Sequence, residues 1–206
     1  MGVDVRGRSS NLKVNYRTSH QIRQAADLLL ATEVTDRDGS IEDRKGTVSV
    51  FNGPAPEIVR LNDEFDEERF VGEWLNARRA EGMRPEEMAI FVRSPAQLDR
   101  GEKAAEAANV GFIRLSEEMS LTPDLLPVCT MHLAKGLEFR AVAVMACDED
   151  VLPDAERIRL AGDTSEIEDV YNSERQILYV ACTRARDRLL ISSATTSSEF
   201  LRDMRT

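Results

Sequence analysis

The chain has 206 residues, of which 42% are hydrophobic and 31% charged, and its formal net charge is −10. This composition is typical of a globular core and excludes a disordered chain; no apolar run approaches the roughly 20 residues that span a bilayer. Nonspecific nucleic-acid binding through bulk charge is also excluded, although a less acidic face could still meet a phosphate backbone. Three cysteines without CxxC spacing predict reduced core residues of a cytoplasmic protein, and two distant histidines predict no metal site.

Periodicity and turn residues predict the elements in chain order. Residues 1–14 are interpreted as a lead-in from an upstream ATPase domain. The first elements are a helix from Thr18 or Ser19 to about Leu30, a polar loop over 32–46, a strand over 47–51, a helix from Asp66 to Glu81, a strand over 88–93 and a helix over 95–109. Next come strands near 110–115, over 126–131 and directly after Glu138, an acidic loop over 148–169, a helix from about Glu174 to Ala185, a strand over 188–193 and a short amphipathic tail.

Strands that alternate with helices predict a mostly parallel sheet covered by helices on both faces. The continuous apolar run at 88–93 (MAIFVR) is typical of a strand buried on both sides. We find no internal repeat and no low-complexity segment. We therefore expect one α/β domain over residues 1–206.

A polar stretch interrupts two apolar segments in the second half of the chain. Ligands of open α/β sheets bind beyond the carboxyl ends of the strands. Thr130 and His132 fall at that end of a predicted strand, and 132–138 is expected to form the turn beyond it. Gly136 allows a tight or positive-φ backbone, and Glu138 could accept hydrogen bonds from a sugar hydroxyl. The alternative is a solvated loop without function.

A second pattern lies at 171–191 (YNSERQILYVACTRARDRLLI), where Arg184 ends a mostly apolar helical row. One interpretation is that Arg184, Arg186 and Arg188 complement the dipole at the helix C-terminus. The other is that Arg184 points into a site that holds anionic oxygens, for which a guanidinium is the preferred partner.

A third pattern is NLKVNYRTSHQI at 11–22, where Tyr16 and Arg17 stand immediately before a predicted helix. An aromatic residue there can stack on a base and an arginine can reach a phosphate; the alternative is a packing anchor and a surface arginine. A P-loop of the form GxxxxGK[ST] is missing, since no glycine of this chain is followed by lysine.

Taken together and in order, these segments resemble the C-terminal motor domain of UvrD/Rep-type superfamily 1 DNA helicases. NYRTSHQI resembles helicase motif IV, TMHLAKGLEF resembles motif V, and ERQILYVACTRARDRLLI resembles motif VI. MAIFVRS and the VLP at 151–153 also match linking segments of the family. The resemblance spans nearly the whole chain, and the pairing of HxxKGLEF with LYVAxTRA is specific.

The resemblance implies a RecA-like three-layer domain, one of two in a motor that holds ATP between its domains and single-stranded DNA across its top. The P-loop and the Mg²⁺-binding acids would belong to an N-terminal RecA-like domain, a partner that this sequence does not contain. The implied roles are adenine stacking by Tyr16, γ-phosphate contacts by Arg17 and Arg184, ribose contacts near Gly136 and Glu138, and DNA contacts by Thr130, His132 and Lys135.

The implied activity is that of an ATP-dependent DNA helicase or translocase with a role in DNA repair, to which the isolated chain contributes without being active itself. A non-catalytic helicase-like interaction module and the motor half of a helicase–nuclease are the alternatives. One departure concerns the long helical insertion, the 2B subdomain, which larger family members carry between the 88–93 strand and motif V. Only residues 94–129 intervene here, and a helix and a short strand account for them.

Overall fold

The computed structural model describes residues 14–15, 18–30, 34–35, 41–42, 48–49, 51–116 and 120–204. A sheet of six strands lies at its centre, and all neighbouring strands in it are parallel. In spatial order these strands are β5 (Glu57–Leu61), β10 (Ala185–Ala194), β9 (Phe139–Val144), β6 (Met88–Val92), β8 (Leu126–Thr130) and β7 (Phe112–Arg114). Parallel strands place all their carboxyl ends at one end of the sheet and all their amino ends at the other.

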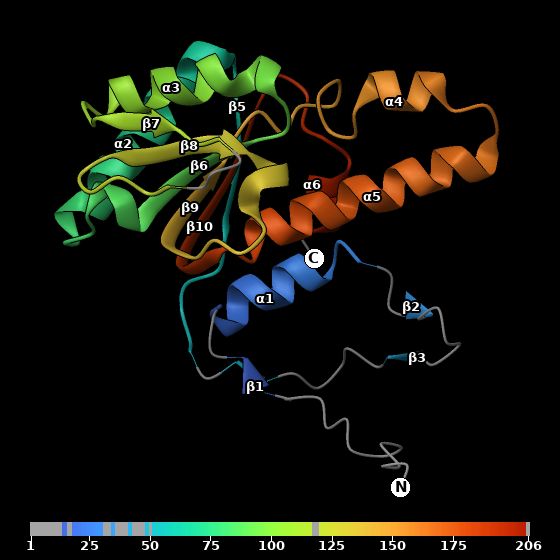
Figure 1. The fold of residues 1–206 in the computed structure, drawn as a ribbon, viewed down its shortest axis with the longest axis horizontal. Coiled ribbons are helices and arrows are strands. Elements are labelled where there is room, and N and C mark those ends of the chain that lie inside the picture. The colour runs from blue at the N-terminus through green and yellow to red at the C-terminus, as the bar shows by residue number, and fades with distance from the viewer. Residues whose placement is uncertain are drawn as a thin grey trace, which may run out of the picture.

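Helices cover both faces of this sheet (Figure 1). The helices are α1 (His20–Asp27), α2 (Glu64–Ala80), α3 (Leu98–Ala107), α4 (Ala155–Leu160), α5 (Thr164–Cys182) and α6 (Phe200–Asp203), with short 3-10 turns η1 (Pro85–Glu87), η2 (Pro95–Gln97) and η3 (Met131–Ala134). One core packs α2 and α3 against the sheet, and the other packs α1, α5 and α6 against the opposite face. The predicted α/β fold with a sheet between two helical layers is confirmed.

Strand β6 shows why the sheet lies between two cores. Its side chains alternate between the faces, so Met88, Ile90 and Val92 enter the core under α2 and α3. Ala89 and Phe91 enter the core under α1 and α5. All five residues are fully buried, which confirms the prediction from the apolar run.

Two short strand pairs lie outside the central sheet. β1 (Val14–Asn15) pairs in parallel with β4 (Val48–Ser49), which confirms part of the strand expected at 47–51. β2 (Val34–Thr35) and β3 (Ile41–Glu42) pair antiparallel within the segment that was expected to be a polar loop.

The acidic segment at 148–169 was predicted as a loop, and this prediction is wrong in part. It contains α4 and the first turns of α5, which begins at Thr164 and not near Glu174. The side chain of Asp163 caps α5 by accepting a hydrogen bond from the N–H of Glu166 at 2.9 Å. The early turns of α5 are mostly exposed, so they lack the apolar periodicity that marks the rest of the helix.

Other boundaries also shift. Strand β5 was not predicted, and β10 begins at Ala185, three positions before the predicted start at 188. Between β6 and β8, α3 and β7 occupy the chain, as expected. Among the described residues, no helix combines the length and the apolar character needed to cross a membrane.

Candidate functional site

The amino end of the sheet brings together three segments that are far apart in sequence. The hydroxyl of Thr18, just before α1, donates a hydrogen bond to the carbonyl of Thr183 at 3.0 Å. The N–H of Phe139, at the start of β9, donates to the carbonyl of Arg184 at 3.0 Å. The start of α1, the start of β9 and the link between α5 and β10 therefore meet here, and we call this place the α5–β10 junction.

Arg184 lies in this junction with its side chain partly buried. Its Nε donates to the carbonyl of Val180 at 3.0 Å, and its Nη1 donates to the carbonyl of Leu137 at 3.3 Å. The guanidinium thus ties the last turn of α5 to the residues that precede β9. A bond to the carbonyl four residues back is typical of a basic residue at a helix C-terminus, as one of the two sequence interpretations expected.

Gly136 and Glu138 also lie at the amino end of the sheet, directly before β9. This corrects the expectation that 132–138 forms a turn beyond the carboxyl end. Because β9 is parallel to β6 and β6 is parallel to β8, the connection must return along the whole sheet before β9 can start. As a result, Gly136 and Glu138 lie near Arg184 and at the opposite end of the sheet from Thr130.

The backbone at Gly136 has the left-handed conformation that the sequence suggested, with φ of +88°. A Cβ placed there would meet no heavy atom within 4 Å, so the space above the residue is open. Glycine is thus required by the conformation and not by crowding, and Glu138 is exposed beside this open space.

Thr130 and His132 lie at the carboxyl end of the sheet, as predicted. Thr130 is the last residue of β8, His132 is an exposed residue of η3, and Lys135 follows η3 on the surface. Partial burial, and then the positive charge of Arg93, lower the pKa of His132. The expected DNA-facing and nucleotide-facing residues are thereby separated along the 131–138 connection. Tyr16 and Arg17 lie outside the described residues, and their roles stay predictions.

A pocket of about 260 Å³ opens beside the α5–β10 junction, between Ser19, Phe51 and the start of β10. Arg140 and Arg186 share one carboxylate at its rim: Arg186 Nε lies 2.8 Å and Arg140 Nε lies 3.1 Å from oxygens of Asp187. Hydrogen bonding from Arg186 is the largest of the effects that lower the pKa of Asp187. Sequence reasoning missed this cluster, because the pairing of Arg140 with Asp187 joins two neighbouring strands.

A second missed group is a buried ion cluster at the carboxyl end, which we call the Glu174 cluster. Glu174 of α5 is fully buried, and its carboxylate accepts hydrogen bonds from Arg93 Nε and Nη2, both at 2.5 Å. Arg157 Nη1 donates to the same carboxylate at 2.5 Å, and Asp154 lies 3.6 Å from Arg93 Nη2. The signal in the sequence was the position of Glu174 four residues before Leu178, on the buried stripe of the helix.

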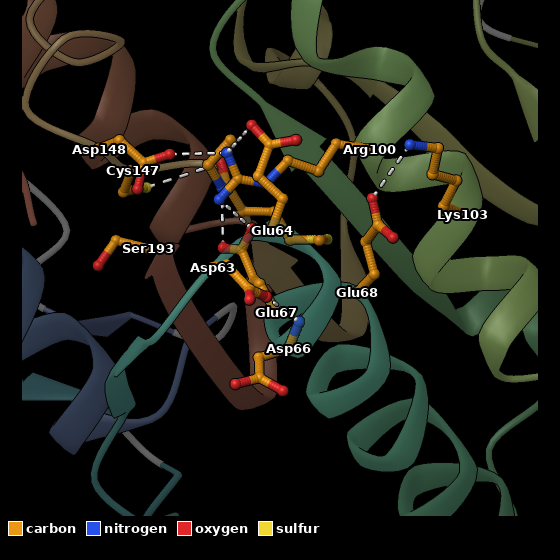
Figure 2. Close-up of polar contacts among 12 residues, drawn as sticks. Asp63, Glu64, Asp66, Glu67, Glu68, Arg100, Lys103, Cys147, Asp148 and Ser193 are labelled. Carbon is orange, nitrogen blue, oxygen red and sulfur yellow. Dashed lines mark hydrogen bonds and ion pairs between the residues drawn. The ribbon is translucent and has the colours of Figure 1, made fainter. Parts of the chain in front are cut away.

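A third group, the Arg100 cluster, lies after the carboxyl end of β9, on the face of the sheet that α2 and α3 cover. Figure 2 shows its polar contacts. Arg100 of α3 donates to Asp148 at 2.7 Å and pairs with Glu67 of α2. Glu67 also accepts a hydrogen bond from the N–H of Ala146 at 3.1 Å. Burial is the largest effect on both carboxyl groups and raises the pKa of Glu67 and of Asp148. This cluster joins α2, α3 and the segment after β9.

The thiol groups of this chain belong to its core. Cys129, Cys147 and Cys182 are buried and free, which confirms their predicted place in the core. Burial raises the pKa of Cys129 to about 12, so this thiol stays protonated and unreactive at neutral pH. In the part of the chain that the structure describes, no group of three or more His, Cys, Asp or Glu residues could hold a metal ion.

The parallel sheet between two helical layers, with the predicted motif segments at both of its ends, defines a RecA-like α/β domain. A solved structure supports this fold: the C-terminal domain of a possible DNA helicase from Lactobacillus plantarum WCFS1 superposes with a TM-score of 0.63. The superposition covers 93% of this chain and 94% of that one, at 23% sequence identity.

Comparisons of sequences show a family likeness over part of the chain. Residues 108–196 match the UvrD-like helicase C-terminal domain. ATP-dependent DNA helicase UvrD1 of Mycobacterium leprae is 32% identical over 117 residues, which are 55% of this chain and 14% of the relative. ATP-dependent DNA helicase PcrA of Staphylococcus epidermidis is 33% identical over 125 residues, which are 57% of this chain and 16% of the relative. Residues 108–196 are therefore similar to the C-terminal domain of UvrD-like helicases, and the predicted resemblance is confirmed.

Proposed function

We propose that this chain is the C-terminal motor domain of an ATP-dependent DNA helicase or translocase. In this proposal a P-loop domain of the same protein completes an ATP site at the amino end of the sheet. Single-stranded DNA contacts Thr130, His132 and Lys135 at or near the carboxyl end. The related helicases carry the term ATP-dependent in their names, and the chain spans only 14% and 16% of the two relatives compared above. DNA repair and a cytoplasmic location belong to the same proposal.

The observation that carries the proposal is the α5–β10 junction. It holds a guanidinium, Arg184, beside the open space above Gly136 and the start of α1. Phosphoryl transfer is catalysed mainly by positioning and charge stabilisation, so an arginine that reaches the γ-phosphate across a domain boundary is a sufficient contribution from this half. Arg17, three residues before the first residue of α1, would supply a second such arginine, and Tyr16 would stack on the adenine. The Mg²⁺ that accompanies ATP would be held by acids of the P-loop domain.

The test is steady-state ATP turnover of the full-length protein with saturating oligo(dT). Arg184→Ala should lower turnover by on the order of 10³, the range of arginine fingers. Arg184→Lys should restore little, because a point charge cannot reproduce the planar fork. Loss of the bonds to Val180 and Leu137 should also cost roughly 0.5–1.5 kcal/mol each in stability, which urea unfolding measures separately. Arg202→Ala, an exposed arginine of α6, is the control and should turn over ATP normally.

Two outcomes would contradict the proposal. Near-normal turnover in Arg184→Ala, together with a lower unfolding free energy, would leave Arg184 a purely structural residue at a helix end. ATP turnover by the 206-residue chain alone would contradict the division of the site between two domains, since we expect the isolated chain to be inactive. A full-length protein without DNA-stimulated turnover would favour the non-catalytic module.

A further inference from the structure

The Glu174 cluster holds α5 against the sheet, but the buried charges carry a large desolvation cost. The side chain of Glu174 is 0% exposed and that of Arg93 is 4% exposed, so both charges are removed from water. Desolvation offsets most of the attraction in a buried ion pair, and apolar residues of similar volume often give equal or greater stability. What an ion pair adds is geometry: two parallel hydrogen bonds between Arg93 and Glu174 allow one register only.

This pair fixes the position of α5 relative to η3, the turn that is expected to contact DNA. Arg93 directly follows β6, and η3 follows β8, the neighbouring strand. Met131 and Ala134 of η3 are buried in the same core as Leu178 of α5. His132 is coupled electrostatically to all four members of the Glu174 cluster, since Arg93 and Arg157 lower its pKa while Glu174 and Asp154 raise it.

Helix α5 links this place to the opposite end of the sheet. From Glu174 to Cys182, the last residue of α5, the helix advances about 1.5 Å per residue, or about 12 Å in all. At the far end Arg184 donates to the carbonyl of Leu137 at 3.3 Å. Helix α5 is therefore attached to the 131–138 connection at two places, by packing in its middle beside the Glu174 cluster and by the hydrogen bond from Arg184 to Leu137 just beyond its C-terminus. A displacement of the η3 turn can reach Arg184 through this connection and through the helix.

We propose that Arg93 and Glu174 are positioning residues that make the placement of Arg184 depend on single-stranded DNA at the η3 turn. Neither residue touches DNA or nucleotide in this proposal; their pair holds α5 in the register that DNA sets at the turn. The inference rests on the proposed function, because it assigns a regulatory role within the same ATP site. The Arg93–Glu174 pair affects the stimulation of ATP turnover by DNA. DNA affinity and ATP turnover without DNA depend on other residues.

The experiment is ATP turnover by the full-length protein, with and without saturating oligo(dT). In the double variant Arg93→Met/Glu174→Leu both charges are replaced by apolar groups, so no buried charge is left unpaired within the pair. We expect its unfolding midpoint, its oligo(dT) affinity and its DNA-free turnover to stay close to wild type. Stimulation by oligo(dT) should fall by about tenfold, within the usual range of coupling between sites.

The Arg100 cluster provides a matched control. The triple variant Glu67→Leu/Arg100→Met/Asp148→Asn removes a buried ion cluster of similar burial at the same end of the sheet, but on the face away from α5. It should keep normal stimulation by oligo(dT). Any loss of stimulation through general loosening of the domain would affect this variant as well, and an equal loss in both would overturn the inference.

A second variant covers the case in which the double variant fails to fold. Arg93→Lys keeps the positive charge but cannot make the two-point contact with Glu174, so it should fold and lose stimulation by about fivefold. Wild-type stimulation in either folded variant would overturn the positioning role. If the wild-type protein itself shows no stimulation by oligo(dT), the proposed function fails, which is a distinct result.

Discussion

His132 is a residue whose surroundings oppose its protonation. It lies near the guanidinium groups of Arg93 and Arg157 and near the carboxylates of Glu174 and Asp154. Burial is the largest effect on its pKa and Arg93 the next, and both lower it from its ordinary value near 6.5. The imidazole is therefore mainly neutral at pH 7, and a contact with DNA at this pH would use a hydrogen bond instead of a full charge.

This lowered pKa predicts a pH dependence of stability. Below about pH 6.5 the unfolded chain binds a proton at His132 more readily than the folded chain does. The free energy of unfolding should therefore fall as the pH decreases from 7.5 to 5.5, and it should fall less in His132→Gln. Urea unfolding of the 206-residue chain at both pH values measures this difference. His20→Gln controls for the loss of an imidazole, and an equal pH dependence in wild type and His132→Gln would contradict the prediction.

At the scale of elements, the packing of α2 on α3 depends on a glycine. A Cβ at Gly72 would lie 2.9 Å from the Cβ of Ala107 and 3.0 Å from the backbone nitrogen of Ala108. Backbone atoms of a helix cannot move aside as the tip of a long side chain can. The absence of a side chain at Gly72 thus sets how closely the two helices approach above their shared core.

Gly72→Ala should destabilise the domain although alanine favours helix formation. The gain in helix propensity is about 1 kcal/mol, whereas overpacking costs typically about 1–3 kcal/mol. We expect a net loss of about 1 kcal/mol in urea or thermal unfolding. Ala77→Ser adds one atom on the exposed side of the same helix and should change stability by less than about 0.5 kcal/mol. A more stable Gly72→Ala would show that the two helices can separate without cost.

At the scale of the whole molecule, the net charge of the chain has the same sign as the charge of the proposed DNA ligand. The formal net charge is −10, and single-stranded DNA is a polyanion. Attraction must therefore come from a local face, for which Lys135 is the exposed cation of the 131–138 connection. Because the rest of the surface repels DNA over a long range, the isolated chain should bind DNA weakly.

We expect binding of oligo(dT) by the 206-residue chain to be weak and to decrease steeply with salt. Each phosphate contact contributes about 0.7 to the slope of log affinity against log salt for single strands. Lys135→Ala should lower this slope by about that amount in fluorescence anisotropy titrations. Lys103→Ala, on α3 across the sheet and 3.4 Å from Glu68, should leave the slope unchanged. Tight binding that is insensitive to salt would contradict the prediction.

The sequence by itself determined the features that follow from the residue pattern within one strand or helix. The apolar run of β6 indicated a strand buried on both faces, and Leu178 and Cys182, four positions apart, form the buried side of α5. Both patterns arise because each residue of an element meets either solvent or core at a fixed period. The motif segments were recognised for the same reason, since their residues are contiguous. The start of α5 was missed because solvent surrounds it and imposes no period.

Only the tertiary structure decided where these segments meet. The 131–138 connection separates Thr130 from Gly136 by the length of the sheet, because parallel strands force the chain back to the amino end before β9 begins. Arg93 and Glu174 are 81 residues apart. A charged residue on a buried face needs a partner of opposite charge, but the sequence does not identify that partner. Burial follows from the periodicity within one element, whereas the partner of a buried side chain depends on the path of the whole chain.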